Sequence, residues 1–145
     1  MSANPGDSDR VPDEETALRA DPRLAAAVDL FNAGDWHACH DGFETLWHEC
    51  QGPVRPVLQG ILQIAVAELH RERGNRRGAT VLMGEGLGRL RGCGAEALGL
   101  RLEPLRLAAR ARLEALQGGG PLDSLPLPRL EPSGPGEASA GAPVH

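Results

Sequence analysis

Apolar residues recur through the middle of the chain at spacings of three and four, which is the pattern of helices buried on one side. Five segments show this pattern, at about residues 22–32, 36–49, 56–73, 76–91 and 104–116. Turn-forming residues lie between them, including Gly34, Gly52-Pro53, Gly74 and the Gly92-Cys93-Gly94 run. The pattern predicts five helices separated by short turns.

No segment alternates apolar and polar residues for long enough to predict a strand. Short connections place consecutive helices antiparallel, so we expect an all-α antiparallel helical-hairpin bundle of about five helices. Residues 31–40, Phe-Asn-Ala-Gly-Asp-Trp-His-Ala-Cys-His, resemble the middle of a tetratricopeptide hairpin. The 34-residue period of that repeat is not met, so the expected fold is only distantly tetratricopeptide-like.

The two ends of the chain differ from the middle. Residues 1–16 are polar and acidic, and residues 117–145 are rich in Gly and Pro with only short apolar groups. Such segments bury too little apolar surface to offset the entropy of ordering them. We therefore predict a disordered acidic N-terminal arm over 1–16, a helical-bundle domain over 17–116 and a disordered tail over 117–145.

Composition adds little about function. The 145-residue chain has a formal net charge of −5, and all its Lys and Arg positions are Arg. Residues 55–116 hold eleven Arg and six acidic residues, so the predicted helices are locally basic. A basic face attracts acidic partners, but a solvated helix surface has the same composition. Nucleic acid is therefore not an expected partner.

The three cysteines, Cys39, Cys50 and Cys93, lack the spacing of a metal site, and Cys39 has the context of a small core residue. No apolar run near the start reads as a signal peptide, and none approaches the roughly 20 residues of a membrane span. These features predict a cytoplasmic protein with reduced thiols that does not contact membranes.

Side chains that can bind a metal or transfer protons gather in the second predicted helix, on the face toward the third. His40, Glu44 and His48 lie four residues apart, on one helix face. Antiparallel pairing places Gln63 and His70 of the third helix opposite this face, with Gly60 leaving room beside Glu44 and Trp47. We therefore predict one polar cluster at the interface of the two helices.

Two hypotheses account for such a cluster. It is either a buried hydrogen-bonded network that fixes the register of two helices, or a site for a metal or small ligand. For the second hypothesis the candidate catalytic groups and metal ligands are His40, Glu44 and His70, and the cofactor would be a divalent metal. The spacing lacks the second His of an H-E-x-x-H zinc motif, which favours the structural hypothesis. No motif for an organic cofactor is present.

Three stretches resemble the domain-of-unknown-function 309 family of small helical proteins. They are residues 31–47, which contain Phe-Asn-x-Gly-Asp-Trp, His40-Asp41 and Glu44-x-x-Trp47; residues 58–67, Leu-Gln-Gly-Ile-Leu-Gln-Ile-Ala-Val-Ala; and residues 70–79, His-x-x-x-Gly-Asn-x-x-Gly-Ala. The resemblance covers about residues 24–91, with Asp41 where the family usually has Glu. It implies an all-α hairpin bundle and no particular activity.

The resemblance also implies that a set of polar, aromatic and glycine positions belongs to one shared pattern. Together with the helix pairing, it gives the predicted polar cluster: His40, Asp41, Glu44, Trp47, Gln63, His70 and Asn75.

Three functional hypotheses follow. The first is a small binding or scaffold-like helical module that recognises a protein partner or a second copy of itself. The second is a metal-dependent, hydrolase-like enzyme that uses His40, Glu44 and His70. The third is a module that binds an acidic partner through its Arg-rich helices.

Overall fold

A computed structural model describes residues 13–133 of the chain. Within these residues there are six helices and three two-residue strands. In chain order they are α2 (Glu14–Ala20), α3 (Pro22–Asn32), α4 (Trp36–Glu49), α5 (Arg55–Glu72), α6 (Arg76–Arg91), β1 (Glu96–Ala97), β2 (Leu100–Arg101), α7 (Leu102–Gly118) and β3 (Glu131–Pro132). The five predicted helices are confirmed as α3 to α7, and α2 is additional.

The helix boundaries follow the local signals in the sequence. Asp21, Asp35 and Asn75 cap the starts of α3, α4 and α6 by accepting a hydrogen bond from a backbone N–H of the first turn. Gly34 and Gly74, which follow α3 and α5, have φ of 76° and 80°. Residues with a side chain rarely adopt this left-handed conformation, so glycine ends both helices.

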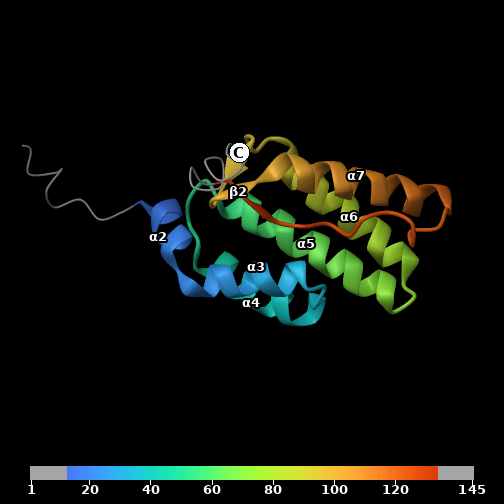
Figure 1. The fold of residues 1–145 in the computed structure, drawn as a ribbon, viewed down its shortest axis with the longest axis horizontal. Coiled ribbons are helices and arrows are strands. Elements are labelled where there is room, and N and C mark those ends of the chain that lie inside the picture. The colour runs from blue at the N-terminus through green and yellow to red at the C-terminus, as the bar shows by residue number, and fades with distance from the viewer. Residues whose placement is uncertain (1–12, 134–145) are drawn as a thin grey trace, which may run out of the picture.

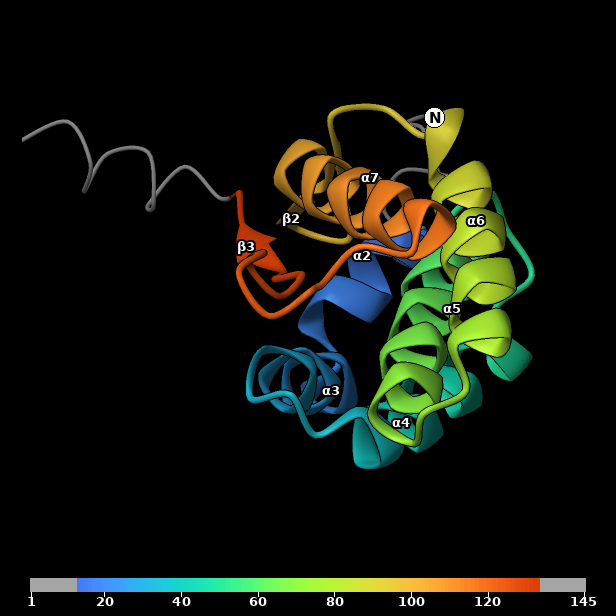
Figure 2. The ribbon, with the colours of Figure 1, turned by 90° about the vertical axis from the view of Figure 1, so that its right-hand side faces the viewer.

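The helices are arranged as an arc of adjacent pairs. Each of α3 to α6 packs against the next helix in the chain, and the α5–α6 contact is the most extensive. Viewed along the helices, the arc runs from α3 through α4, α5 and α6 to α7 (Figure 2). Its two ends, α3 and α7, face each other. The concave surface between them is here called the inner side of the arc.

A small antiparallel sheet in the order β1-β2-β3 lies beside the start of α7, at one end of the helices (Figure 1). The prediction that no strand forms is therefore wrong. Glu96 pairs with Arg101 and Ala97 with Leu100 around a tight turn in which Leu98 and Gly99 have positive φ. Arg101 in turn pairs with Glu131. Two-residue strands are too short to show an alternating pattern, so periodicity cannot predict them.

The segment that follows α7 completes the inner side of the arc. Residues 119–133, here called the closing segment, run back beside α7 and reach β2 (Figure 1). They lie between α3 and α7 in Figure 2. Leu122 and Leu130 are 7% and 1% exposed. The predicted disordered tail is therefore wrong for this segment, because a few buried side chains at the right places anchor it to the helices.

The predicted N-terminal boundary is also displaced. Glu14 to Thr16 belong to α2, and Leu18 of this helix is buried against the core. The packed part described by the structure thus extends beyond 17–116 at both ends. The rest of the predicted arm, residues 1–12, and of the predicted tail, residues 134–145, lies outside the described residues.

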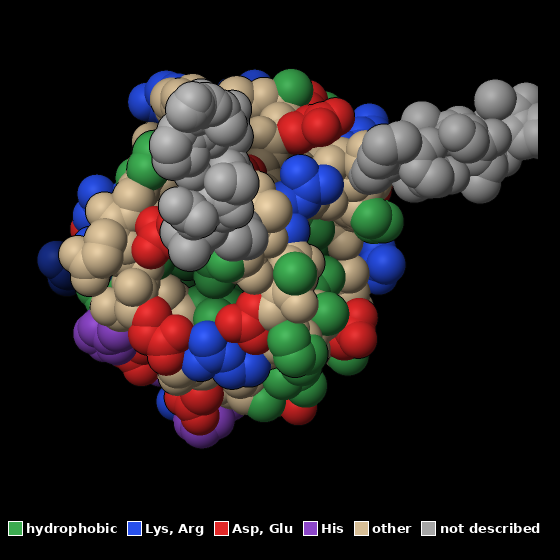
Figure 3. All heavy atoms as spheres, turned by 90° about the vertical axis from the view of Figure 1, so that its left-hand side faces the viewer, with side chains coloured by type: hydrophobic (Ala, Val, Ile, Leu, Met, Phe, Trp, Pro, Cys, Tyr) green, Lys and Arg blue, Asp and Glu red, His purple; other side chains and the backbone are tan. Residues whose placement is uncertain are grey.

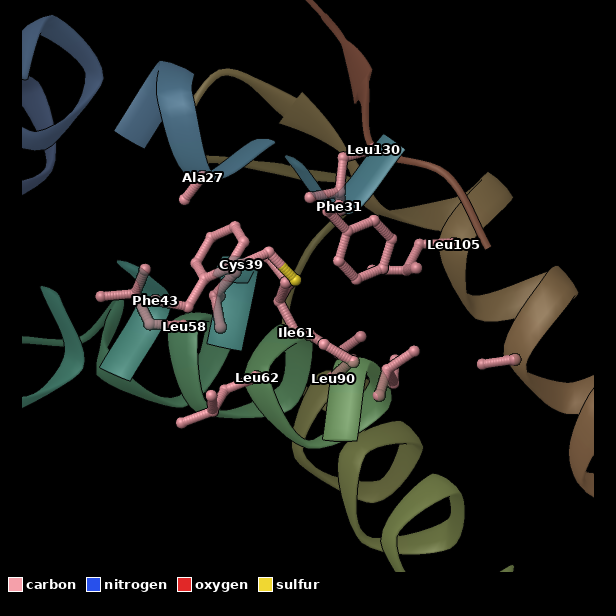
Figure 4. Close-up of a cluster of buried hydrophobic side chains, with 14 of the residues drawn as sticks. Ala27, Phe31, Cys39, Phe43, Leu58, Ile61, Leu62, Leu90, Leu105 and Leu130 are labelled. Carbon is pink, nitrogen blue, oxygen red and sulfur yellow. The ribbon is translucent and has the colours of Figure 1, made fainter. Parts of the chain in front are cut away.

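The hydrophobic core draws on every helix of the arc and on the closing segment. Figure 4 shows Phe31 of α3, Phe43 of α4, Ile61 of α5 and Leu130 of the closing segment converging. Phe31 packs edge-on against Trp36 and Phe43. Trp36 is 2% exposed and Trp47 is half-buried. Among the described residues, no helix has the length and hydropathy that a membrane span requires.

Candidate functional site

Polar groups of α4 form a compact surface cluster. Asp41 Oδ1 lies 3.1 Å from Nδ1 of His40, and Glu44 Oε1 lies 3.9 Å from its Nε2. The other oxygen of Glu44 is 3.9 Å from Nε2 of His48. The side chains of His40 and Glu44 are 29% and 43% exposed. The helical spacing therefore brings these residues together, as predicted, but at the surface.

The remaining residues of the predicted cluster have other partners. Gln63 donates a hydrogen bond to Glu85 of α6 at 3.2 Å. His70 contacts the side-chain nitrogen of Asn75 at 3.1 Å, at the turn between α5 and α6. Within the described residues, the predicted single buried network does not form. The structure instead divides the residues between the surface of α4 and the α5–α6 side.

The neighbours of Gly60 explain this division. A Cβ atom at Gly60 would lie 2.8 Å from Cγ of Leu90 and 3.0 Å from the carbonyl oxygen of Gly86. Gly60 therefore allows α5 to approach α6, and it does not leave room for Glu44 and Trp47 as predicted. Trp47 is covered by Arg55, whose guanidinium carbon lies 4.1 Å from the ring centroid. Antiparallel pairing was assigned correctly, but the face of α5 was not.

A buried ion pair that was not predicted joins α5 to α7. Glu68 and Arg112 have side chains 0% and 1% exposed, with two hydrogen bonds of 2.5 and 2.9 Å between them. Arg112 also donates to the carbonyl oxygens of Leu125 and Pro126 in the closing segment. One feature of the sequence could have predicted this pair. Arg112 lies on the apolar stripe of the last helix, where a charge without a partner would be costly to bury.

Asn32 holds the C-terminal part of the closing segment. Its Nδ2 donates to the carbonyl oxygen of Leu130 at 2.9 Å, and its Oδ1 accepts from the N–H of Leu130 at 2.8 Å. The amide thus satisfies both backbone groups of one residue in an extended chain. These bonds recognise the backbone and require no particular side chain, while the buried Leu130 side chain adds selectivity.

Apolar hollows lie on both sides of the closing segment. One of about 470 Å³ lies between α3 and the turn at Leu98-Gly99, with Leu130 and Pro132 on one wall. Another of about 340 Å³ lies between α7 and the closing segment. It is lined by Leu107 and Leu127, which are 53% and 47% exposed. The inner side of the arc therefore presents apolar surface beyond what the closing segment covers.

Several Arg residues of the basic region bind within the protein. Arg76 donates to the carbonyl oxygens of Ala115 and Gly120, and Arg106 donates to those of Leu90, Cys93 and Gly94. Figure 3 shows acidic and basic side chains mixed over one face of the molecule. Part of the Arg excess thus ties helix ends and turns together and is not free to bind an acidic partner.

The cysteine side chains lack the environment of a nucleophile. Cys39 is fully buried, and burial raises the pKa of its thiol to about 12. Burial also raises the pKa of Cys50 and of Cys93. A nucleophilic cysteine needs a lowered pKa, because the thiolate is the reactive form. The placement of Cys39 in the core matches its predicted role.

Comparison with known families assigns the central part of the chain to a protein family. Residues 24–82 match the family described as Domain of unknown function (DUF309). No curated protein matches the chain significantly in sequence. The chain therefore contains a DUF309 domain, which spans α3, α4, α5 and the start of α6. The resemblance seen in the sequence is confirmed, and the family description carries no activity.

Proposed function

We propose that this DUF309-containing chain is a binding module whose inner side, between α3 and α7, recognises an extended protein segment. The observation that carries the proposal is the pair of hydrogen bonds between Asn32 and the backbone of Leu130. A side-chain amide that satisfies the N–H and the C=O of one residue is a means of holding an extended chain. In the structure the closing segment occupies this place.

The closing segment has the features of a bound ligand more than those of a regular element. Apart from β3 it contains no helix or strand, so its backbone relies on bonds from the helices. Arg112 supplies such bonds at its middle and Asn32 supplies them near its C-terminal end. Three of its side chains are buried, those of Leu122, Pro128 and Leu130. Main-chain bonds combined with spaced apolar anchors are how extended peptides are commonly bound.

The position of the segment supports its replacement by a partner. It is joined to α7 through Gly118-Gly119-Gly120, a run of residues with high backbone freedom. A partner segment of similar chemistry, extended and with leucines at matching intervals, would make the same bonds. The closing segment then acts as an internal competitor. The apparent affinity for the partner equals the intrinsic affinity multiplied by the fraction of molecules in which the segment is displaced.

A peptide-binding experiment tests the proposal. A fluorescent peptide of residues 119–133 is titrated with the full chain and with the Leu130→Asp variant, in which the closing segment is weakened but the helices are unchanged. We expect the variant to bind the peptide several-fold more tightly, because its inner side is less often occupied. Adding Asn32→Ala to the variant should abolish that gain.

The matched control is a peptide that carries the same Leu130→Asp change, which should not bind either protein. Circular dichroism of each variant checks that the helices remain folded. If folded Leu130→Asp protein binds the unmodified peptide no better than the parent, the closing segment is a fixed part of the fold and the proposal fails.

A further inference from the structure

The polar cluster on α4 lies apart from the inner side of the arc and has a separate use. We propose that His40, Asp41 and Glu44 bind one divalent transition-metal ion, with Zn²⁺ as the representative. One ligand atom from each residue can be chosen so that all three lie within 4.8 Å of one another. Ligands that share an ion at 2.0–2.2 Å are separated by roughly 3–4 Å. Asp41 and Glu44 approach different ring nitrogens of His40, so binding requires a side-chain rotation that brings both carboxylates to the same nitrogen.

The type of ligand selects the metal. One imidazole nitrogen and two carboxylates suit Zn²⁺ and its neighbours, whereas Mg²⁺ and Ca²⁺ prefer oxygen ligands alone. Three ligands from about one helical turn leave the outer coordination positions for water. The side chain of Asp41 is 66% exposed and that of Glu44 is 43% exposed, so an ion can enter without opening the fold.

The charges around the cluster are an independent argument. Asp41 and Glu44 are three residues apart on α4, and like charges at that spacing destabilise a helix. In the described part of the chain, their only ion-pair partners are histidines. By contrast, four carboxylates elsewhere each pair with an Arg: Glu49, Glu68, Glu103 and Glu131. A bound cation would supply the compensating charge that α4 lacks.

The surroundings hold the cluster in position. Asp35 caps the start of α4, and Cys39 and Phe43 bury the opposite face of the helix in the core. Trp47 packs under Arg55 and lies next to His48, with ring centroids 4.8 Å apart. Since His48 reaches the second oxygen of Glu44, it keeps that carboxylate on the same side of the helix.

The test is titration of the full chain, free of any affinity tag, with ZnCl₂ by calorimetry and with CoCl₂ by absorption spectroscopy. We expect one ion per chain and a cobalt spectrum of a site containing nitrogen. His40→Ala and Glu44→Gln should each weaken binding at least tenfold, a size seen for metal-site residues. Excess MgCl₂ should not displace the ion.

His37→Ala is the matched control, because His37 is exposed and lies on the same helix but outside the cluster. It should bind Zn²⁺ as the parent does. Thermal unfolding checks the fold, and each variant should melt close to the temperature of the parent, because substitutions at exposed positions change stability little. Absence of saturable binding, or equal weakening by His37→Ala and His40→Ala, would overturn the proposal without affecting the proposed peptide site.

Discussion

Single side chains reach across the chain to hold its irregular parts, and Glu14 is the clearest example. Its carboxylate accepts hydrogen bonds from the backbone N–H groups of Gln51 and Gly52 at 2.8 and 2.6 Å. These bonds, chiefly the one from Gln51, hold the pKa of Glu14 below its usual value. A residue in the predicted disordered arm thus organises the turn between α4 and α5.

Replacement of Glu14 by Gln should lower the melting temperature at neutral pH, because an amide is a weaker acceptor and its NH₂ end cannot accept at all. A lowered pKa in the folded state stabilises the protein above the pKa of the unfolded state, and this contribution is lost as the pH falls through the folded pKa. Thermal melts across an acidic pH series should therefore converge for parent and variant. Glu114→Gln, at an exposed position, is the control and should leave the melting curve unchanged.

At the scale of elements, α5 and α6 are held together by two glycines that face each other. A Cβ atom at Gly86 would lie 2.8 Å from the carbonyl oxygen of Gly60 and 2.9 Å from Cγ1 of Ile64. In the sequence, Gly84, Gly86 and Gly88 look alike and simply weaken a helix. Only the contact with α5 distinguishes Gly86, and periodicity along one helix does not contain that information.

Gly86→Ala should cost about 1–3 kcal/mol, because the methyl group meets backbone and forces the two helices apart. Gly88→Ala should instead stabilise the protein by up to about 1 kcal/mol, since nothing lies within 4 Å of its added Cβ and alanine favours the helix. Urea denaturation of the two variants gives the comparison directly. Equal effects would mean that the close approach of α5 to α6 is absent in solution.

Helices and turns were predictable because their signals are local. Asp21-Pro22, Gly34 and Gly74 mark ends that the structure confirms within a few residues. The register between helices was not predictable: Gly60 was assigned to the α4 side and in fact faces α6. The cluster on α4 was found because its members share one helix, whereas Gln63 and His70 were added through that incorrect pairing.

At the scale of the whole molecule, an arc of helix pairs has two ends that are distant in sequence and need to be joined. The closing segment does this, with Asn32 of α3 bound to Leu130 and Arg112 of α7 bound to Leu125 and Pro126. Its Gly and Pro content suggested disorder. That expectation failed because composition measures how many apolar side chains are present and not which positions they occupy. Leu122 and Leu130 fall where the arc is open.

The Glu68–Arg112 pair links α5, α7 and the closing segment, so its removal tests how the arc is closed. Arg112→Met leaves a buried carboxylate and two carbonyl oxygens without their partner. Loss of one member of a buried pair costs about 3–5 kcal/mol. We expect the lower end of that range, because Arg71 still donates to Glu68 at 2.9 Å.

The double variant Glu68→Met with Arg112→Met should be more stable than Arg112→Met alone. It removes the unpaired buried charge and fills the space with apolar groups of similar size. Measured in urea, the loss of unfolding free energy in the double variant should therefore be smaller than the sum of the two single losses by more than about 1 kcal/mol, the sign of strong coupling between neighbours. Additive losses would show that each side chain acts alone and that the ion pair does not couple α5 to α7.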